Sequence, residues 1–171
     1  MLGADYHNIS ISGIALTDGA GYLPYGMQSR YRLLDPDDES SLWDFTRFVP
    51  DICVMALGIN DTYATGNVNG RTWRENYRQL IHELREQYGA DTRFVFAVPP
   101  MVEAEADVIQ WSTTLVETLK SEGIDAYQYI FELGKVKDHP IASEQQTIAE
   151  ELYRFLNEQV IALSLIHISE P

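Results

Sequence analysis

The chain has 171 residues, of which 45% are hydrophobic and 22% are charged. That length and composition are typical of one globular domain with its own core. Against 26 acidic residues stand only 12 basic ones, and the formal net charge of -14 repels phosphate backbones and anionic lipid. We therefore expect no nucleic-acid partner and no membrane partner. The single cysteine, Cys53, excludes an internal disulfide and a thiolate metal cluster.

The two ends of the chain are unusual. The first residues lack the basic and apolar regions of a signal peptide, and strand-like sequence follows almost at once, which indicates that an N-terminal piece is missing. No apolar run approaches the roughly 20 residues of a transmembrane helix. Residues 164–171 resemble a peptide translated by accident from a sequencing adapter. We predict one domain over residues 1–163 and a non-native tail over 164–171, and the sequence leaves the compartment open.

Four segments carry the strand pattern of short apolar or alternating runs between turn residues. We predict strands over residues 6–12, 52–58, 93–98 and 126–131. The second and third are nearly continuous in apolar residues, as expected for strands that are covered on both faces.

Between the strands, apolar residues recur at spacings of three and four, which is typical of one face of a helix. Three such stripes run along residues 73–88, 108–119 and 148–160. Thr72 with Glu75, and Ser143 with Gln146, have the spacing of a capping box at the start of the first and third stripes. Gly89 and Gly123 follow the first two stripes and predict their ends.

Alternating strands and helices predict an α/β fold, a three-layer sandwich with a parallel sheet and helices on both faces. Residues 17–41 form a long loop rich in Gly, Tyr, Pro and Asp, which we interpret as a binding surface or a lid. A short helix is expected within residues 42–48. Ligands on such sheets bind at the carboxyl ends of the strands, so the candidate site is sought there.

Three chemically useful residues follow three of the predicted strands. Gly13 comes after the first strand, Asn60 after the second and His139 after the last. A backbone N–H at Gly13 and the side-chain amide of Asn60 are suitable donors to an oxyanion, and a histidine is a suitable general base near neutral pH. Together they indicate acyl transfer.

Each of these residues also has an ordinary structural interpretation. Gly13 could only permit a tight turn, Asn60 and Asp61 could form a local turn or a helix cap, and His139 could be a surface residue before a helix. Asp61 is interpreted as holding a loop through hydrogen bonds to the backbone. No metal cluster and no phosphate-binding glycine loop is evident, so no cofactor is expected.

The sequence resembles the SGNH hydrolases, also called GDSL-type esterases and lipases. The segment Gly-Ile-Asn-Asp at residues 58–61 is similar to their Gly-x-Asn-Asp block, Ser12 and Gly13 to their glycine block, and Asp-His-Pro at 138–140 to their histidine block. The pattern is most similar to the family-two carbohydrate esterases, which remove acetyl groups from plant polysaccharides. The resemblance implies a flavodoxin-like sheet, a bacterial enzyme of the acetylxylan esterase kind, and a monomer.

Carried over by this resemblance, His139 is the general base, and Gly13 N–H and Asn60 Nδ2 form the oxyanion hole. Two features depart from the family pattern. No Gly-Asp-Ser block is present, so the first strand and the nucleophilic serine are missing, and Ser12 does not have the setting of a nucleophile. The position of the usual orienting aspartate holds Val136, so a carbonyl group would orient the histidine, as in the family-two enzymes.

The resemblance therefore implies an esterase that acts on acylated carbohydrate or another small ester, in a chain that is itself inactive. Two alternatives stay open. One is a lipase or thioesterase of the same superfamily. The other is a non-catalytic flavodoxin-like module that binds carbohydrate through its tyrosine-rich loop.

Overall fold

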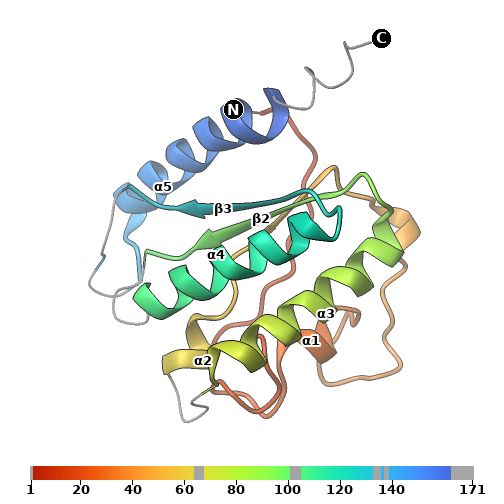
Figure 1. The fold of residues 1–171 in the computed structure, drawn as a ribbon. Coiled ribbons are helices and arrows are strands. Elements are labelled where there is room, and N and C mark those ends of the chain that lie inside the picture. Colours follow the sequence, from red (N-terminus) through yellow and green to blue (C-terminus); the bar gives the residue numbers. More distant parts are fainter. Residues whose placement is uncertain (1, 64–67, 101–104, 133–135, 137–138, 163–171) are drawn as a thin grey trace.

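The computed structural model describes residues 2–63, 68–100, 105–132, 136 and 139–162. Its centre is a parallel sheet of three strands in the order β1-β2-β3 (Figure 1). The strands are β1 (Ile52–Met55), β2 (Arg93–Val98) and β3 (Ala126–Ile130). Three of the four predicted strands are thereby confirmed, with β1 and β3 ending earlier than predicted.

Helices cover both faces of this sheet. The helices are α1 (Met27–Arg30), α2 (Ile59–Tyr63), α3 (Gly70–Tyr88), α4 (Glu105–Ser121) and α5 (Ala142–Phe155), with a 3-10 turn at Phe45–Arg47 and a π-helical continuation of α5 at Leu156–Ile161. Figure 1 shows α3 and α4 on one side of the sheet and α5 on the other. The predicted three-layer α/β fold is confirmed. Within the described part of the chain, no helix combines the length and the apolarity needed to cross a membrane.

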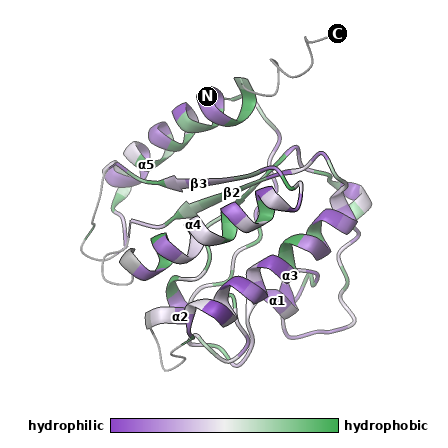
Figure 2. Cartoon of the chain, in the orientation of Figure 1, coloured by the Kyte–Doolittle hydropathy of each residue, from purple (hydrophilic) through white to green (hydrophobic). Residues whose placement is uncertain are grey.

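The side chains of β2 alternate between two hydrophobic clusters. Phe94 and Phe96 face the larger cluster, which includes the buried stripes of α3 and α4. Val95 faces a smaller cluster with Leu156 and Val160. This alternation is the pleat of a strand that is buried on both faces. Figure 2 shows the matching pattern on the helices, which are apolar toward the sheet and polar on the outside.

The predicted strand over residues 6–12 is wrong. This segment is irregular and joins no ladder with a described residue, and Tyr6 is 88% exposed. In the flavodoxin-like strand order 2-1-3-4-5, the second strand pairs only with the first. A segment with a strand-like pattern but no neighbouring strand cannot satisfy its backbone groups within a sheet.

The predicted capping boxes are also wrong. Helix α3 begins one residue after Asn69, whose side-chain oxygen accepts hydrogen bonds from the N–H groups of Arg71 and Thr72 at 3.1 Å each. Asparagine is among the best N-caps, so Thr72 lies inside the helix. Helix α5 begins at Ala142, before Ser143, and the Glu144 carboxylate accepts a hydrogen bond of 2.8 Å from the N–H of Ile141.

The ends of the first two long helices are confirmed. Gly89 follows α3 with φ 102° and donates a hydrogen bond of 2.9 Å to the carbonyl of Arg85. Gly123 follows α4 with φ 74°. The short helix expected within residues 42–48 is a single 3-10 turn, capped by the Asp44 side chain, which accepts a hydrogen bond from the N–H of Thr46.

Candidate active site at the carboxyl end of the sheet

The carboxyl tip of β1 is held by buried aromatic residues of α3. The hydroxyl of the fully buried Tyr77 lies 3.2 Å from both the N–H and the carbonyl oxygen of Leu57, so it can accept one hydrogen bond and donate the other. Gly58 follows with φ 106°, and a Cβ there would collide with the indole of Trp73. Glycine is therefore required at this turn, because no other residue would fit without displacing the buried tryptophan.

Asn60 and Asp61 lie in the first turn of α2, directly after this glycine. Their side chains do not bond within the turn. Asn60 Nδ2 donates to the carbonyl of Ile14 at 2.8 Å, and the Asp61 carboxylate accepts from the N–H groups of Leu16 at 2.8 Å and Thr17 at 2.9 Å. Both residues thus attach a distant loop to the sheet, which excludes the interpretation as a local turn or helix cap.

Asp61 has the role expected of it, because its fully buried carboxylate holds the loop through the backbone. Burial raises the pKa of this carboxyl group, and the hydrogen bonds from Leu16 and Thr17 act in the opposite direction. A carboxylate at this depth with two backbone donors is a positioning group.

Gly13 is placed next to Asn60 by the same contact, because it directly precedes Ile14. It has φ 73°, and a Cβ at this position would touch the ring of Tyr22 at 3.4 to 3.5 Å. Its carbonyl accepts a hydrogen bond of 3.4 Å from the N–H of Tyr22, whereas no described residue accepts a hydrogen bond from its own N–H. Asn60 thus binds the residue next to Gly13, and the N–H of Gly13 has no acceptor among the described residues.

The third predicted residue, His139, is exposed shortly before the start of α5 at Ala142. No hydrogen bond joins it to Gly13 or Asn60 within the described ranges. Earlier in the same connection, the N–H of the buried Val136 donates to the carbonyl of Pro100, just after β2, at 2.9 Å. Asp138, which precedes the histidine, lies outside the described residues.

Neither Ser12 nor Cys53 is suited to act as a nucleophile. Ser12 is exposed in an irregular segment that does not lead from a strand into a helix, and such a turn is the usual setting of a nucleophilic serine. Burial raises the pKa of the Cys53 thiol to about 11, so this side chain is a protonated, small apolar group at neutral pH.

Glu151 is a positioning residue that the sequence analysis did not identify. This buried side chain of α5 accepts a hydrogen bond of 2.8 Å from the N–H of Glu132, just after β3, and one of 3.3 Å from the hydroxyl of Tyr129. Burial, followed by the charge of Glu151, raises the pKa of Tyr129 to about 12. The contact fixes α5 against the carboxyl end of β3. A lone glutamate in an amphipathic helix carries no sequence signal for such a role.

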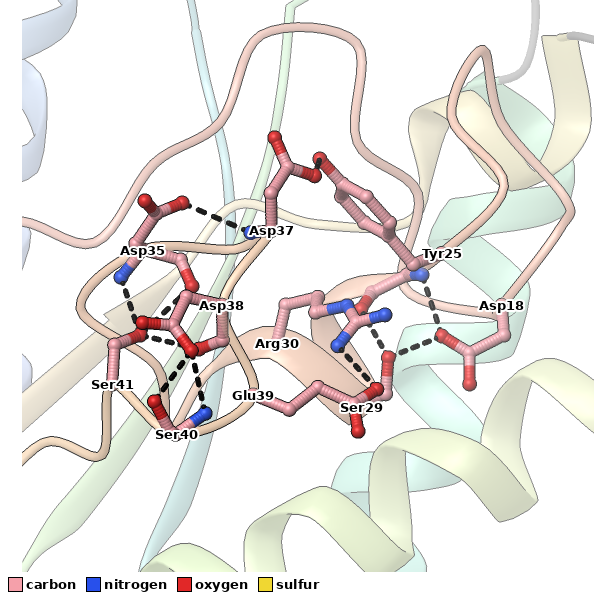
Figure 3. Close-up of polar contacts among 11 residues, drawn as sticks. Asp18, Tyr25, Ser29, Arg30, Asp35, Asp37, Asp38, Glu39, Ser40 and Ser41 are labelled. Atoms are coloured by element: carbon pink, nitrogen blue, oxygen red, sulfur yellow. Dashed lines mark hydrogen bonds and ion pairs between the residues drawn. The ribbon is translucent and has the colours of Figure 1, made fainter.

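The loop of residues 17–41 is held together mainly by its own polar side chains (Figure 3). One Asp18 oxygen accepts hydrogen bonds from the Gly26 N–H at 2.6 Å and the Ser29 hydroxyl at 2.7 Å. Arg30 reaches Glu39 at 3.3 Å and lies over the ring of Tyr25. These contacts surround a hollow of about 430 Å³ lined by Asp18, Tyr25, Arg30 and neighbouring side chains. Within the described ranges, no group of three or more His, Cys, Asp or Glu side chains is arranged to hold a metal ion.

Comparison with known proteins gives related enzymes. No family model matches the chain. It is 33% identical over 102 residues to the cellulase/esterase CelE of Acetivibrio thermocellus, a match that covers 59% of this chain and 12% of that protein. An active-site mutant of a family-two carbohydrate esterase from Clostridium thermocellum superposes with a TM-score of 0.72 and 29% identity, over 86% of this chain and 47% of that one.

A family-two carbohydrate esterase from Clostridium thermocellum in complex with cellohexaose gives a TM-score of 0.71 and 27% identity, over 85% of this chain and 47% of that one. The chain thus spans about half the length of the solved structures that it matches. The fold and these comparisons together confirm the resemblance of this chain to the family-two carbohydrate esterases.

Proposed function

We propose that this chain carries part of the active site of an esterase that removes acyl groups, acetyl in particular, from carbohydrates. The observation that supports this proposal is the 2.8 Å hydrogen bond from Asn60 Nδ2 to the carbonyl of Ile14, the residue that follows Gly13, whose own N–H has no acceptor among the described residues. Two such donors at the carboxyl edge of a parallel sheet suit an oxyanion. Esterase relatives on the same fold support the same chemistry.

The reaction proposed is a two-step acyl transfer. His139 accepts the proton of a serine hydroxyl that these 171 residues do not supply, and the serine oxygen bonds to the acyl carbon. Gly13 N–H and the second Nδ2 hydrogen of Asn60 bind the oxyanion of the tetrahedral intermediate. His139 then protonates the departing sugar oxygen, which leaves an acyl-enzyme. Water repeats the sequence, releasing the acid and restoring the serine.

The test compares the chain alone with a chain extended at its amino end by an apolar strand that ends in Gly-Asp-Ser. The extended chain should hydrolyse p-nitrophenyl acetate and the 171-residue chain should not. In the extended chain, His139→Ala should lower kcat/KM by at least about a thousandfold, and Asn60→Ala by about a hundredfold or more. His82→Ala is the matched control, because His82 pairs with Glu122 on the outer surface of α3 and α4.

Two outcomes would contradict this proposal. An unchanged rate in the His139→Ala variant would remove the assigned base. Turnover by the 171-residue chain that disappears in Ser12→Ala would show that the nucleophile lies within it. Faster hydrolysis of long-chain esters than of acetylated sugars would favour a lipase or thioesterase instead.

A second candidate function is carbohydrate binding without hydrolysis, which the hollow beside Tyr25 favours. Aromatic faces beside carboxylate and guanidinium groups are suited to sugar rings and their hydroxyl groups. Calorimetric titration of the 171-residue chain with cellohexaose tests this directly. Binding that is lost in Tyr25→Ala, together with an inactive extended chain, would support this function over the esterase.

A further inference from the structure

The two carboxylates that line the hollow of about 430 Å³ are held very differently. Asp18 is bound into the loop, because one of its oxygens accepts hydrogen bonds from the Gly26 N–H at 2.6 Å and the Ser29 hydroxyl at 2.7 Å. Glu39 has a side chain that is 84% exposed, and among the described residues it reaches Arg30 alone, at 3.3 Å. The hollow therefore has one fixed carboxylate and one that is free to move away.

Arg30 has unused hydrogen-bond donors at this hollow. Its guanidinium group lies over the ring of Tyr25, 4.8 Å from the ring centre, and its side chain is only 19% exposed. Nη1 donates to Glu39 at 3.3 Å, which is longer than the roughly 2.7–2.9 Å of a strong charge-assisted hydrogen bond. Nε and Nη2 have no acceptor among the described residues. The ring thus holds the guanidinium group in place while most of its donors stay unused (Figure 3).

The rest of the wall adds a second cation and an apolar side. Arg32 is exposed at the hollow, and Pro24, Leu33 and Leu42 line it as well. A ligand that fits must therefore offer acceptors to the guanidinium groups and an apolar surface to these side chains. A sugar ring that carries a carboxylate offers both, because its C–H groups are apolar and its carboxylate matches the planar fork of an arginine.

The charge of the protein favours a ligand with a single negative charge. The formal net charge of the chain is -14, and Asp18 and Glu39 lie at the hollow itself. Each further negative charge on a ligand adds repulsion from these groups. A phosphate dianion is therefore disfavoured relative to a carboxylate.

We propose that this hollow is a binding site for a sugar acid, a hexuronate whose carboxylate pairs with Arg30 and displaces that of Glu39. The hollow is connected to the candidate active site, because Thr17, which precedes Asp18, donates its N–H to Asp61 at 2.9 Å. That the bound acid is a sugar rests on the proposed function, whose substrate class the site narrows to carbohydrates with acidic residues.

Calorimetric titration of the 171-residue chain with glucuronate tests the site, with glucose and inorganic phosphate as comparison ligands. Glucuronate should bind at least about tenfold more tightly than phosphate, and also than glucose, which has a hydroxymethyl group in place of the carboxylate. Absence of glucuronate binding, or equal affinity for glucose, would overturn the proposal. Phosphate binding that is as tight as glucuronate binding would overturn the choice of a sugar acid.

Two substitutions should move the affinity for glucuronate in opposite directions. Arg30→Gln should weaken binding by about tenfold or more, because the carboxylate loses its charged partner. Glu39→Gln should strengthen binding by about threefold or more, because the competing carboxylate is gone, and a misfolded variant cannot produce such a gain. The matched controls are Arg47→Gln, whose guanidinium group lies over Trp43 outside the hollow, and Glu117→Gln on the exposed side of α4. Both should leave the affinity unchanged.

Unchanged or weaker binding in Glu39→Gln, or equal losses in Arg30→Gln and Arg47→Gln, would overturn the site. Hydrolysis of p-nitrophenyl acetate by the extended chain, measured without any sugar acid, tests the proposed function separately. If glucuronate binds and the ester is not cleaved, the sugar-acid site stands and the esterase function fails. If the ester is cleaved and glucuronate does not bind, the function stands and the sugar-acid site fails.

Discussion

Two parts of β1 differ in the contacts that hold them. The tip is residues 57–61, which follow the strand, and the flank is the side of the strand away from β2. At the tip, Leu57 is bonded to a buried tyrosine, Gly58 lies against a buried indole, and Asp61 binds two backbone N–H groups of a distant loop. At the flank, Val54 is 42% exposed and no described residue pairs with the backbone on the side away from β2. Among the described residues, the strand is thus bonded at its tip and unpaired along its flank.

The contacts that hold the tip thus come from elements of the described chain itself. Asn60 and Gly13 are positioned by α2, α3 and the loop of residues 17–41, all of which belong to this chain. We therefore expect substitutions at the tip to cost far more stability than substitutions at the flank.

The largest loss of stability is expected for Gly58→Ala. The new methyl group would collide with Trp73 and would require a non-glycine residue at φ 106°, so the free energy of unfolding should fall by about 3 kcal/mol or more. Urea denaturation followed by tryptophan fluorescence measures this loss. Gly89→Ala is the matched control, because it has φ 102° but no atom within 4 Å of the added Cβ. It should lose only about 1 kcal/mol from backbone strain. Equal losses would show that the contact with Trp73 is unimportant.

The next largest loss of unfolding free energy is expected for Asp61→Asn. An amide offers one acceptor where the carboxylate accepts from both Leu16 and Thr17, and a buried N–H left without a partner costs about 1–3 kcal/mol. The cost should depend on pH. Because burial raises the folded-state pKa of Asp61 above 3.8, the group contributes most below the unfolded pKa, and this contribution is lost as the pH rises through the folded pKa.

Denaturation of the wild type and Asp61→Asn at several pH values from 3 upward should therefore give a stability difference that shrinks as the pH increases. A difference that grows instead would mean that the two backbone donors outweigh burial and that the folded-state pKa is lowered. Asp38→Asn is a suitable control, since Asp38 is exposed and bonds only within its own turn.

Tyr77→Phe should follow, with a loss of about 1–2 kcal/mol, because it removes the hydroxyl that serves both backbone groups of Leu57 in a buried site. The ring itself stays in place against Trp73 and Phe96. Tyr25→Phe removes an exposed hydroxyl bonded to Asp37 and should change stability by less than about 0.5 kcal/mol. Similar losses in both variants, measured by thermal melting, would contradict a special role for the tip.

The sequence predicts the fold well because its main signals are local. Nearly continuous apolar runs mark β1 and β2, a short strand-like run marks β3, and stripes at helical spacing mark α3, α4 and α5. The failed prediction over residues 6–12 is of a different kind, because a strand forms only with a neighbour, and pairing is not a local property. The predicted helix caps are wrong for a similar reason. Asn69 and Thr72 are both acceptable caps in sequence, and only the geometry decides which one is used.

The candidate site was predictable in part. The Gly-x-Asn-Asp pattern indicates that Asn60 stands at a strand tip, but it does not show that its amide would reach the carbonyl of Ile14, 46 residues earlier. Glu151 and Tyr77 were missed because their roles depend on burial against distant backbone groups. Each is an ordinary residue of an amphipathic stripe in the sequence and acquires its role only through packing.

The smallest change in stability is expected for a substitution on the flank of β1. Val54→Thr exchanges a methyl group for a hydroxyl that can bond to water, so the free energy of unfolding should change by about 0.5 kcal/mol or less. The same exchange at its partner in register, Val95→Thr, buries a hydroxyl in the cluster beneath α5 and should cost about 1–3 kcal/mol. Two valines of the same sheet face thus report on whether a covering layer is present. If Val54→Thr cost as much as Val95→Thr in urea denaturation, the flank of β1 would be covered in solution.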